Sequence, residues 1–174
     1  GLNSFFIYMD DYMIEQFRFG TFQNSILMAV FGLAMAFSSG VLAGPLSARF
    51  RKIPTVTIAV VVMAVSLTIY TFNGSSALSY ALVVPIVVGF GIGYPMMLSL
   101  FSASADDDEQ GWVMGISIAL FTLGCGVISL AGGAMMAIDA RLPFMTGIAS
   151  FLVALILIAT LWRQPDVEAL EGSS

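Results

Sequence analysis

The sequence predicts an all-α, polytopic membrane protein, and two features carry this prediction. Apolar residues make up 59% of the 174 residues and charged residues only 10%, whereas about 25% of the residues of a soluble domain are charged. The chain also contains four long stretches without any charge, at 19–48, 53–105, 110–138 and 142–162. Since a helix needs about 20 apolar residues to cross a bilayer, these stretches predict a transmembrane helix bundle.

The spans follow from the charge-free stretches and from one turn signal. The longest stretch is divided by the cluster Asn73-Gly74-Ser75-Ser76, whose residue types favour a turn. We therefore expect a single transmembrane bundle over 1–174, with about five full spans and a partial first one. The partial span is expected at 1–9, the full spans at 22–46, 53–72, 78–102, 111–138 and 142–162, and a polar tail at 163–174. Because the chain starts with Gly and without a signal peptide or a full span, we expect it to begin inside a longer protein.

Residue types that are rare or missing exclude several functions. The chain has no histidine and a single cysteine, Cys125, so it lacks the usual metal and proton-relay ligand and cannot form an internal disulfide. The sequence predicts no metal site, no cofactor and no enzymatic reaction, because it contains no Ser/His pair and no paired acids deep in a span. With a net charge of −5, the chain is not expected to bind nucleic acid.

Basic residues predict the orientation of the spans. Arg18 and Arg141 fall on one side of the predicted bilayer, and the other four fall on the opposite side: Arg49, Arg51, Lys52 and Arg163. Because Lys and Arg accumulate in short cytoplasmic loops, the loop after the first full span and the carboxyl terminus are expected in the cytoplasm.

Four consecutive acids, Asp106 to Glu109, stand directly before the span at 111–138. Carboxylate oxygens accept hydrogen bonds from free N–H groups at a helix start, where negative charge is also favoured. We expect these acids to cap and solvate the helix, with a site for a partner or a cation as the alternative.

Three glycines alternate in the segment GFGIGYPMM at 89–97. A dinucleotide-binding loop requires a further glycine at the position of Tyr94, and a potassium filter requires a re-entrant loop, so neither fits a segment of membrane length. Helix packing remains, because small residues four apart let two helix backbones approach each other in lipid. The expected packing pairs are Gly40 with Gly44, Gly89 with Gly93, and Gly111 with Gly115.

Pro95, with Pro85 ten residues earlier, is expected to bend the span at 78–102. Proline removes an N–H group and clashes with the carbonyl four residues back. Such breaks persist in membranes where neighbouring helices or a water-lined cavity satisfy the freed carbonyls. Two roles of these prolines therefore remain as alternatives: a structural kink, or a helix break that lines a cavity.

Three segments together resemble the carboxyl-terminal half of a major facilitator superfamily transporter of the drug/proton antiporter kind. GPLSARFRK at 44–52 resembles the family's cytoplasmic loop G-x-L-x-D-R-x-G-R-R, with matches at Gly44, Leu46, Arg49 and Lys52. Ala48 and Arg51 depart from that pattern, in place of Asp and Gly. The segment at 89–116 is similar to the family's tenth span, the following loop and the start of the eleventh, and LGCGVISLAGGAMM at 123–136 resembles the glycine-rich eleventh span.

The resemblance implies a transporter that moves a small organic solute by alternating access, in efflux or uptake, driven by a proton gradient. It implies that this chain is one half of the transporter and pairs with an amino-terminal half or with a second copy of itself. The spans at 22–46, 78–102 and 111–138 would face the central cavity, and the other two would face lipid. The protein would be a multi-pass protein of the bacterial inner membrane. A non-transporting scaffold or interaction subunit, derived from a half-transporter, is the alternative.

Two sets of residues are candidates for a functional site. The candidate solute ligands are the uncharged polar residues of the cavity-facing spans, whose alternative role is hydrogen bonding between helices: Gln23, Asn24, Tyr94, Ser99, Ser117 and Thr122. The candidates for proton coupling follow the partial span, where the chain is expected to return along the outer face: Asp10, Asp11 and Glu15. Adjacent carboxylates repel, and poor hydration raises the pKa of one of them; a solvated outer loop is the alternative.

Overall fold

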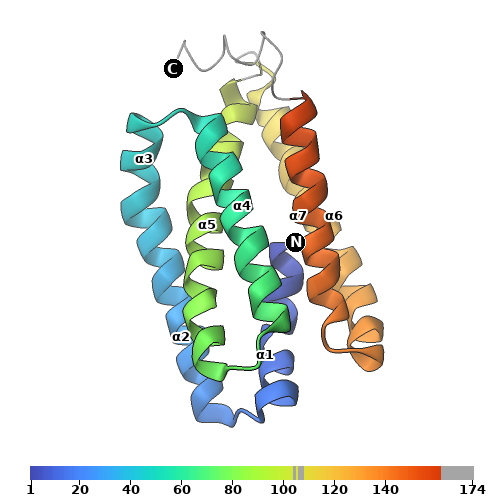
Figure 1. The fold of residues 1–174 in the computed structure, drawn as a ribbon. Coiled ribbons are helices and arrows are strands. Elements are labelled where there is room, and N and C mark those ends of the chain that lie inside the picture. The colour runs from blue at the N-terminus through green and yellow to red at the C-terminus, as the bar shows by residue number, and fades with distance from the viewer. Residues whose placement is uncertain (104, 106–107, 162–174) are drawn as a thin grey trace.

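The computed structural model describes residues 1–103, 105 and 108–161, and helices account for nearly all of them (Figure 1). The described residues contain no strand, so the predicted all-α fold is confirmed. Five helical segments are long and apolar enough to cross a membrane, namely Thr21–Arg49, Lys52–Phe72, Ser76–Ala103, Gln110–Ile138 and Leu142–Thr160. The predicted tail and Arg163 lie outside the described residues.

The first helix, α1 (Leu2–Phe17), continues well beyond the partial span predicted at 1–9. The expectation that the chain turns back along the outer face after Met9 is therefore wrong. An apolar stripe explains the longer helix, because Met9, Tyr12 and Met13 are completely buried on one side of it. Arg18 ends the helix in the left-handed conformation, with φ 54° and ψ 42°.

The first full crossing consists of three consecutive helical pieces. They are α2 (Thr21–Phe37), one π-helical turn η1 (Ser38–Leu42) and α3 (Ala43–Arg49). The family-like segment at 44–52 was expected to form a loop, but it is helical through Arg49, and only Phe50 and Arg51 separate it from α4 (Lys52–Phe72). Pro45 does not end the helix, and the π-helical turn η1 lies shortly before it.

The remaining crossings are α5 (Ser76–Ala103), α6 (Gln110–Ile138) and α7 (Leu142–Leu161). The turn predicted between α4 and α5 is present at 73–75, where Asn73 Nδ2 donates to the Tyr70 carbonyl at 2.9 Å and Asn73 Oδ1 accepts from the Ser75 N–H at 2.8 Å. α5 contains Pro85 and Pro95 and continues through both of them as one helix.

The start of α6 differs from the expected acidic cap. Glu109 occupies the N-cap position and makes no capping hydrogen bond through its side chain, so the cap expected from this residue is not formed. Asp106 and Asp107 lie outside the described residues. A side-chain hydrogen bond of 3.3 Å instead joins Ser102 Oγ, at the end of α5, to Gln110 Oε1, at the start of α6.

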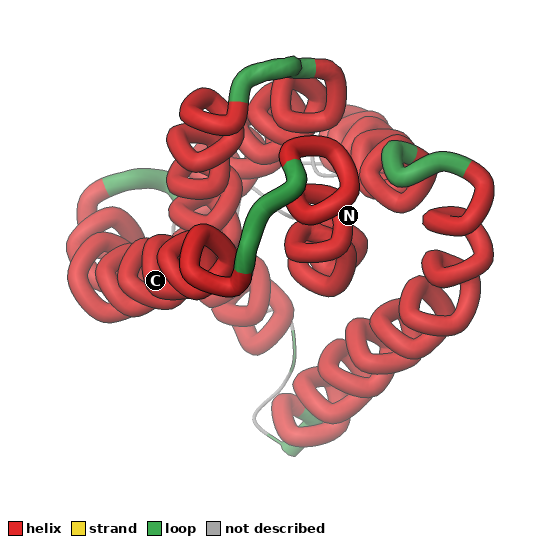
Figure 2. Tube along the Cα trace, turned by 90° about the horizontal axis from the view of Figure 1, so that it is seen from below, coloured by secondary structure: helices red, strands yellow, loops and turns green. Residues whose placement is uncertain are grey.

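The helices stand side by side, with the helix that carries the amino terminus among them (Figure 2). α4 makes its most extensive contact with α5 and packs against α7 on another side, while α2 packs on α5. The connections α1–α2, α4–α5 and α6–α7 lie at one end of the bundle (Figure 1). We call this end the outer end, after the orientation expected from the basic residues.

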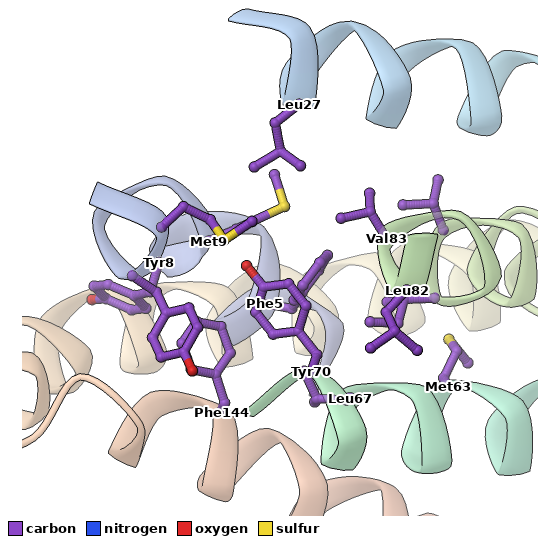
Figure 3. Packing of buried hydrophobic residues seen from close by; sticks show 14 of the residues in the cluster. Phe5, Tyr8, Met9, Leu27, Met63, Leu67, Tyr70, Leu82, Val83 and Phe144 are labelled. Carbon is purple, nitrogen blue, oxygen red and sulfur yellow. The ribbon is translucent and has the colours of Figure 1, made fainter. Parts of the chain in front are cut away.

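An aromatic cluster joins α1, α4 and α7 (Figure 3). The ring of Phe5 meets Tyr70 edge-on, with ring centroids 5.1 Å apart, and the ring of Tyr12 meets Phe144 in the same way at 4.9 Å. Tyr12 also donates a hydrogen bond of 3.0 Å to the Thr71 carbonyl. Edge-on pairs of this kind add to the stability gained by burial, so α1 is held in the bundle along its length.

The three predicted glycine pairs differ in how close another helix lies to them. A Cβ added to Gly89 would lie 2.8 Å from Met63 Cγ, and one added to Gly93 would lie 3.2 Å from Ala59 Cβ, so this pair does lie at the contact between α5 and α4. No described atom of another helix lies within 4 Å of such a Cβ at the other two pairs. Gly40, Gly44, Gly111 and Gly115 therefore make no close contact with another described helix, and the packing predicted for these two pairs stays a prediction.

α6 is the least buried of the five long helices. In the most apolar 18-residue window of α6, no residue is buried. In the corresponding windows of α4 and α5, 44% of the residues are buried. Six of its exposed apolar side chains recur every three or four residues and form a stripe along one face of the helix, which we call the α6 stripe: Trp112, Ile116, Leu120, Leu123, Val127 and Leu130. Ile118 and Phe121 are exposed on another face of α6. The segment Thr21–Arg49, which begins with α2, is the next most exposed, with 17% of its most apolar window buried.

Candidate functional site

A cleft of about 580 Å³ lies between α1 and the start of α2, at the outer end of the bundle. We call it the α1–α2 cleft. Asp10 and Ile14, one turn apart on α1, form one wall, and Asn24 and Met28, one turn apart on α2, form the other. The connecting residues and the first turn of α2 complete it: Phe19, Gly20, Thr21 and Ser25. The structure thus brings a proton-coupling candidate, Asp10, beside a solute-ligand candidate, Asn24.

Asp10 is half-buried in this cleft, opposite Asn24. Asp10 Oδ1 and Asn24 Oδ1 are buried and have no hydrogen-bond partner among the described residues. Burial raises the pKa of Asp10, the charge of Asp11 raises it further, and the side chain of Asn24 opposes both effects. The carboxyl group therefore binds a proton more readily than an exposed aspartate does.

Asp11 and Glu15 do not share this environment. Both are exposed, and their spacing of four residues places them on one face of α1, away from the face that carries Asp10 and Ile14. The sequence predicted one carboxyl group with a raised pKa among these acids. The helical geometry identifies it as Asp10, which is the acid turned toward α2.

Gln23 has a local structural role. Its side-chain oxygen accepts a hydrogen bond of 3.1 Å from the Gly20 N–H at the start of α2, which is how glutamine commonly stabilises a first turn. Its backbone carbonyl accepts a hydrogen bond of 2.8 Å from the Tyr80 hydroxyl of α5. Gln23 therefore fixes the start of α2 beside Asn24, and its side-chain oxygen is already engaged.

Tyr94 lies in a second group of residues, between α5 and α6. Its ring stacks on Phe90, with centroids 5.0 Å apart, and approaches Phe121 of α6 at 5.4 Å. These rings border an apolar cavity of about 240 Å³ together with Gly93 and Met97. Neither phenylalanine was among the predicted site residues, although the spacing of four between Phe90 and Tyr94 places their rings on one helix face.

The hydroxyl candidates near Tyr94 are mostly bonded within their own helices. Ser117 donates to the Val113 carbonyl at 2.8 Å, and Thr122 donates to the Ile118 carbonyl at 2.9 Å. Ser99 is exposed on α5, five residues from Tyr94 and hence roughly 140° around the helix from it. Of these hydroxyls, Ser117 lies one turn from Phe121 on the same face of α6.

The solute-ligand candidates therefore form two groups and not one site. The hydrogen bond from Tyr80 places Gln23 and Asn24 at the level of Tyr80. Tyr94 is fourteen residues further along α5, which corresponds to about 21 Å at 1.5 Å per residue. A small solute cannot contact both groups at once.

Comparison with known proteins assigns the fold to a family. The model of the Major Facilitator Superfamily matches residues 1–173. This chain belongs to the Major Facilitator Superfamily. It is similar to the tetracycline resistance protein, class C, of Escherichia coli, with 26% identity over 145 residues. This match covers 81% of the chain but 36% of that protein's length, and no solved structure matches. The chain is thus an integral membrane protein that spans about a third of the curated relative it matches.

Proposed function

We propose that this chain is one half of a transporter that moves a small organic solute by alternating access, coupled to a proton gradient. The observation that carries the proposal is the match to the Major Facilitator Superfamily across residues 1–173. The similarity to a tetracycline resistance protein favours efflux of an organic compound. The protein would lie in the inner membrane of a bacterium, with its carboxyl terminus in the cytoplasm.

Two structural features support the need for a second half. No other helix in the described part of the chain covers the α6 stripe or the exposed side of α2. Alternating access moves one helix bundle against another, and these two helices provide apolar faces for such a contact. We infer that an amino-terminal half of the same transporter, or a second copy of the chain, covers them.

Asp10 is the proposed proton-coupling residue. Coupling requires a carboxyl group that gains and loses its proton near the working pH, and the raised pKa of Asp10 moves it in that direction. The other charged or titratable groups acting near it are Asp11 on α1 and Tyr70 on α4, while α2 contributes the uncharged Asn24. Tyr94, Phe90 and Phe121 are proposed to contact the solute deeper in the bundle.

Transport in liposomes tests the proposal. The chain is reconstituted alone and together with its amino-terminal half, a pH gradient is imposed, and uptake of tetracycline and movement of protons are followed together. We expect coupled fluxes only with the two halves, and loss of proton-driven accumulation in Asp10→Asn. A folded pair of halves that moves neither protons nor any of a panel of organic solutes would refute transport and favour the scaffold alternative.

A further inference from the structure

We propose that the α1–α2 cleft is a binding site for an organic ammonium ion, whose ammonium group contacts Asp10 and Asn24. The proposal rests on the proposed function in so far as it names a class of solute, but binding is measurable without transport. The site lies at the outer end, at the level of Tyr80. At 1.5 Å per residue along α5, Tyr94 is about 21 Å further along the bundle. It is therefore separate from the aromatic group deeper in the protein.

The first observation is a pair of unused acceptors. Asp10 Oδ1 and Asn24 Oδ1 are both buried without a partner among the described residues, and such groups are costly unless something donates to them. Both side chains line the same cleft, from opposite walls. Two of the donors in the lining are already used, since Ser25 Oγ donates to the Thr21 carbonyl at 2.9 Å and the Gly20 N–H donates to Gln23. The cleft thus favours a ligand that donates hydrogen bonds.

The second observation is the charge. The pKa of Asp10 is shifted by burial of the carboxyl group, by the charge of Asp11 and by the side chain of Asn24. Neither of these two residues carries a positive charge. An ionised carboxylate in a half-buried site is stabilised when a positive charge lies beside it. A cationic ligand is therefore favoured over a neutral one, and an anion is repelled.

The third observation is the character of the walls. Ile14, Phe19 and Met28 give the cleft an apolar side, and an aromatic ring such as that of Phe19 attracts a cation to its face. The volume of about 580 Å³ lies within the roughly 300–1,000 Å³ of small-molecule sites. A bare Ca²⁺ ion fits poorly, because it takes about six to eight oxygen ligands, mostly carboxylates and carbonyls, and Asp10 is the only carboxylate in the described lining of the cleft. The ligand that matches is an ammonium group on an apolar body.

Calorimetric titration of the full chain in lipid nanodiscs tests the site, with 4-phenylbutylammonium as the probe and 4-phenylbutanol as its neutral control. We expect saturable binding of the ammonium compound and at least tenfold weaker binding of the alcohol. Asp10→Asn should weaken ammonium binding at least tenfold. The matched control is Asp11→Asn, which removes the same charge one residue away on the exposed face, and it should change the affinity less than twofold.

A second variant tests whether misfolding, and not the loss of the carboxylate, explains weaker binding. Ile14→Trp keeps Asp10 and fills the cleft from a position that is 47% exposed, so it should block binding while helical content and melting temperature stay unchanged. Equal effects of Asp10→Asn and Asp11→Asn, equal affinity for the alcohol, or undiminished binding to Ile14→Trp would each overturn the proposal.

The transport assay separates the two proposals. Binding that depends on Asp10 in a protein that transports nothing would support the site and refute the transport function. Proton-driven transport of tetracycline, in a protein that shows no saturable ammonium binding, would refute the site and leave the transport function standing.

Discussion

At the scale of single residues, glycine matters where another helix lies directly against it. Gly91 is the clearest case, because a Cβ added there would overlap Ser38 Oγ and lie 2.9 Å from Ser38 Cβ. Ser38 is completely buried and belongs to the π-helical turn η1. The neighbouring Gly89 and Gly93 were predicted to pack against another helix, whereas the contact of Gly91 was not predictable, because Ser38 lies about fifty residues away in the chain.

Gly91→Val should destabilise the protein by about 1–3 kcal/mol, the usual cost of extra groups in a well-packed contact. The measurement is thermal or denaturant unfolding of the purified protein in detergent. Ser38→Gly, which removes both Ser38 side-chain atoms, should recover part of this loss in the double variant.

The matched control is Gly124→Val on α6, where no described atom of another helix lies within 4 Å of the added Cβ. We expect it to change the stability little. A loss at Gly124 as large as that at Gly91 would show that the substitution acts through the helix itself and not through the contact with Ser38.

At the scale of secondary-structure elements, the turn between α1 and α2 depends on an unusual backbone conformation. Arg18 is the only non-glycine residue with positive φ in the described part of the chain, and its N–H donates to the Ile14 carbonyl at 2.9 Å. This conformation closes α1 and lets α2 begin at Thr21, so that Asn24 faces Asp10. The geometry of the α1–α2 cleft therefore depends on the turn.

Arg18→Val should destabilise the α1–α2 turn, because β-branched residues are the least tolerant of positive φ. The left-handed region costs roughly 1–2 kcal/mol for a residue with a Cβ, and Val should add to this cost. Arg18→Gly should keep or raise the melting temperature despite the loss of a charge. If both variants lose stability equally, the side chain of Arg18 contributes more than its backbone conformation does.

The helices were predictable where long charge-free segments had to cross a bilayer, and the errors occur where that argument ends. α1 carries Asp10, Asp11 and Glu15, so a rule based on missing charge ended it too early, while burial of Tyr12 and Met13 against α4 and α7 extends it. The family-like segment at 44–52 was assigned to a loop by its charges, yet helical hydrogen bonding continues through Arg49.

The candidate site was predictable in composition but not in arrangement. Asp10 and Asn24 are predictable as polar residues near one membrane face, but only the turn between α1 and α2, with both helices packed on α5, brings them into one cleft. Conversely, Gln23 and Tyr94 looked like members of one site, and the register between α2 and α5 separates them. Spacing along a helix predicts a face, whereas the height of one helix against another depends on contacts between distant residues.

At the scale of the whole molecule, burial is unevenly shared among the helices. α4 and α5 form the centre of the bundle, while α6 and α2 present apolar side chains outward. Leu130 in the α6 stripe is 86% exposed, and Val65 on α4 is 52% exposed. In a complete transporter the α6 stripe would contact the other half, whereas the outer face of α4 would contact lipid.

Spin labels distinguish these two faces. A nitroxide at Leu130→Cys, in a Cys125→Ala background, should collide with dissolved oxygen less often once the amino-terminal half is present. The same label at Val65→Cys should keep its oxygen accessibility. Power-saturation EPR in lipid bilayers measures both positions, and an unchanged value at position 130 would contradict the assignment of the α6 stripe to the contact between halves.

The short connection between α4 and α5 has a consequence for how the protein enters its membrane. Asn73 satisfies the Tyr70 carbonyl and the Ser75 N–H with its own side chain, and it also donates to Ser79 Oγ at 3.2 Å. When a connection crosses the hydrocarbon layer with its polar groups hydrogen-bonded to one another, few water molecules need to accompany it. Since α4 and α5 also make the most extensive contact among the described helices, we expect them to enter the bilayer together as a helical hairpin, against which the earlier and later segments pack during biogenesis.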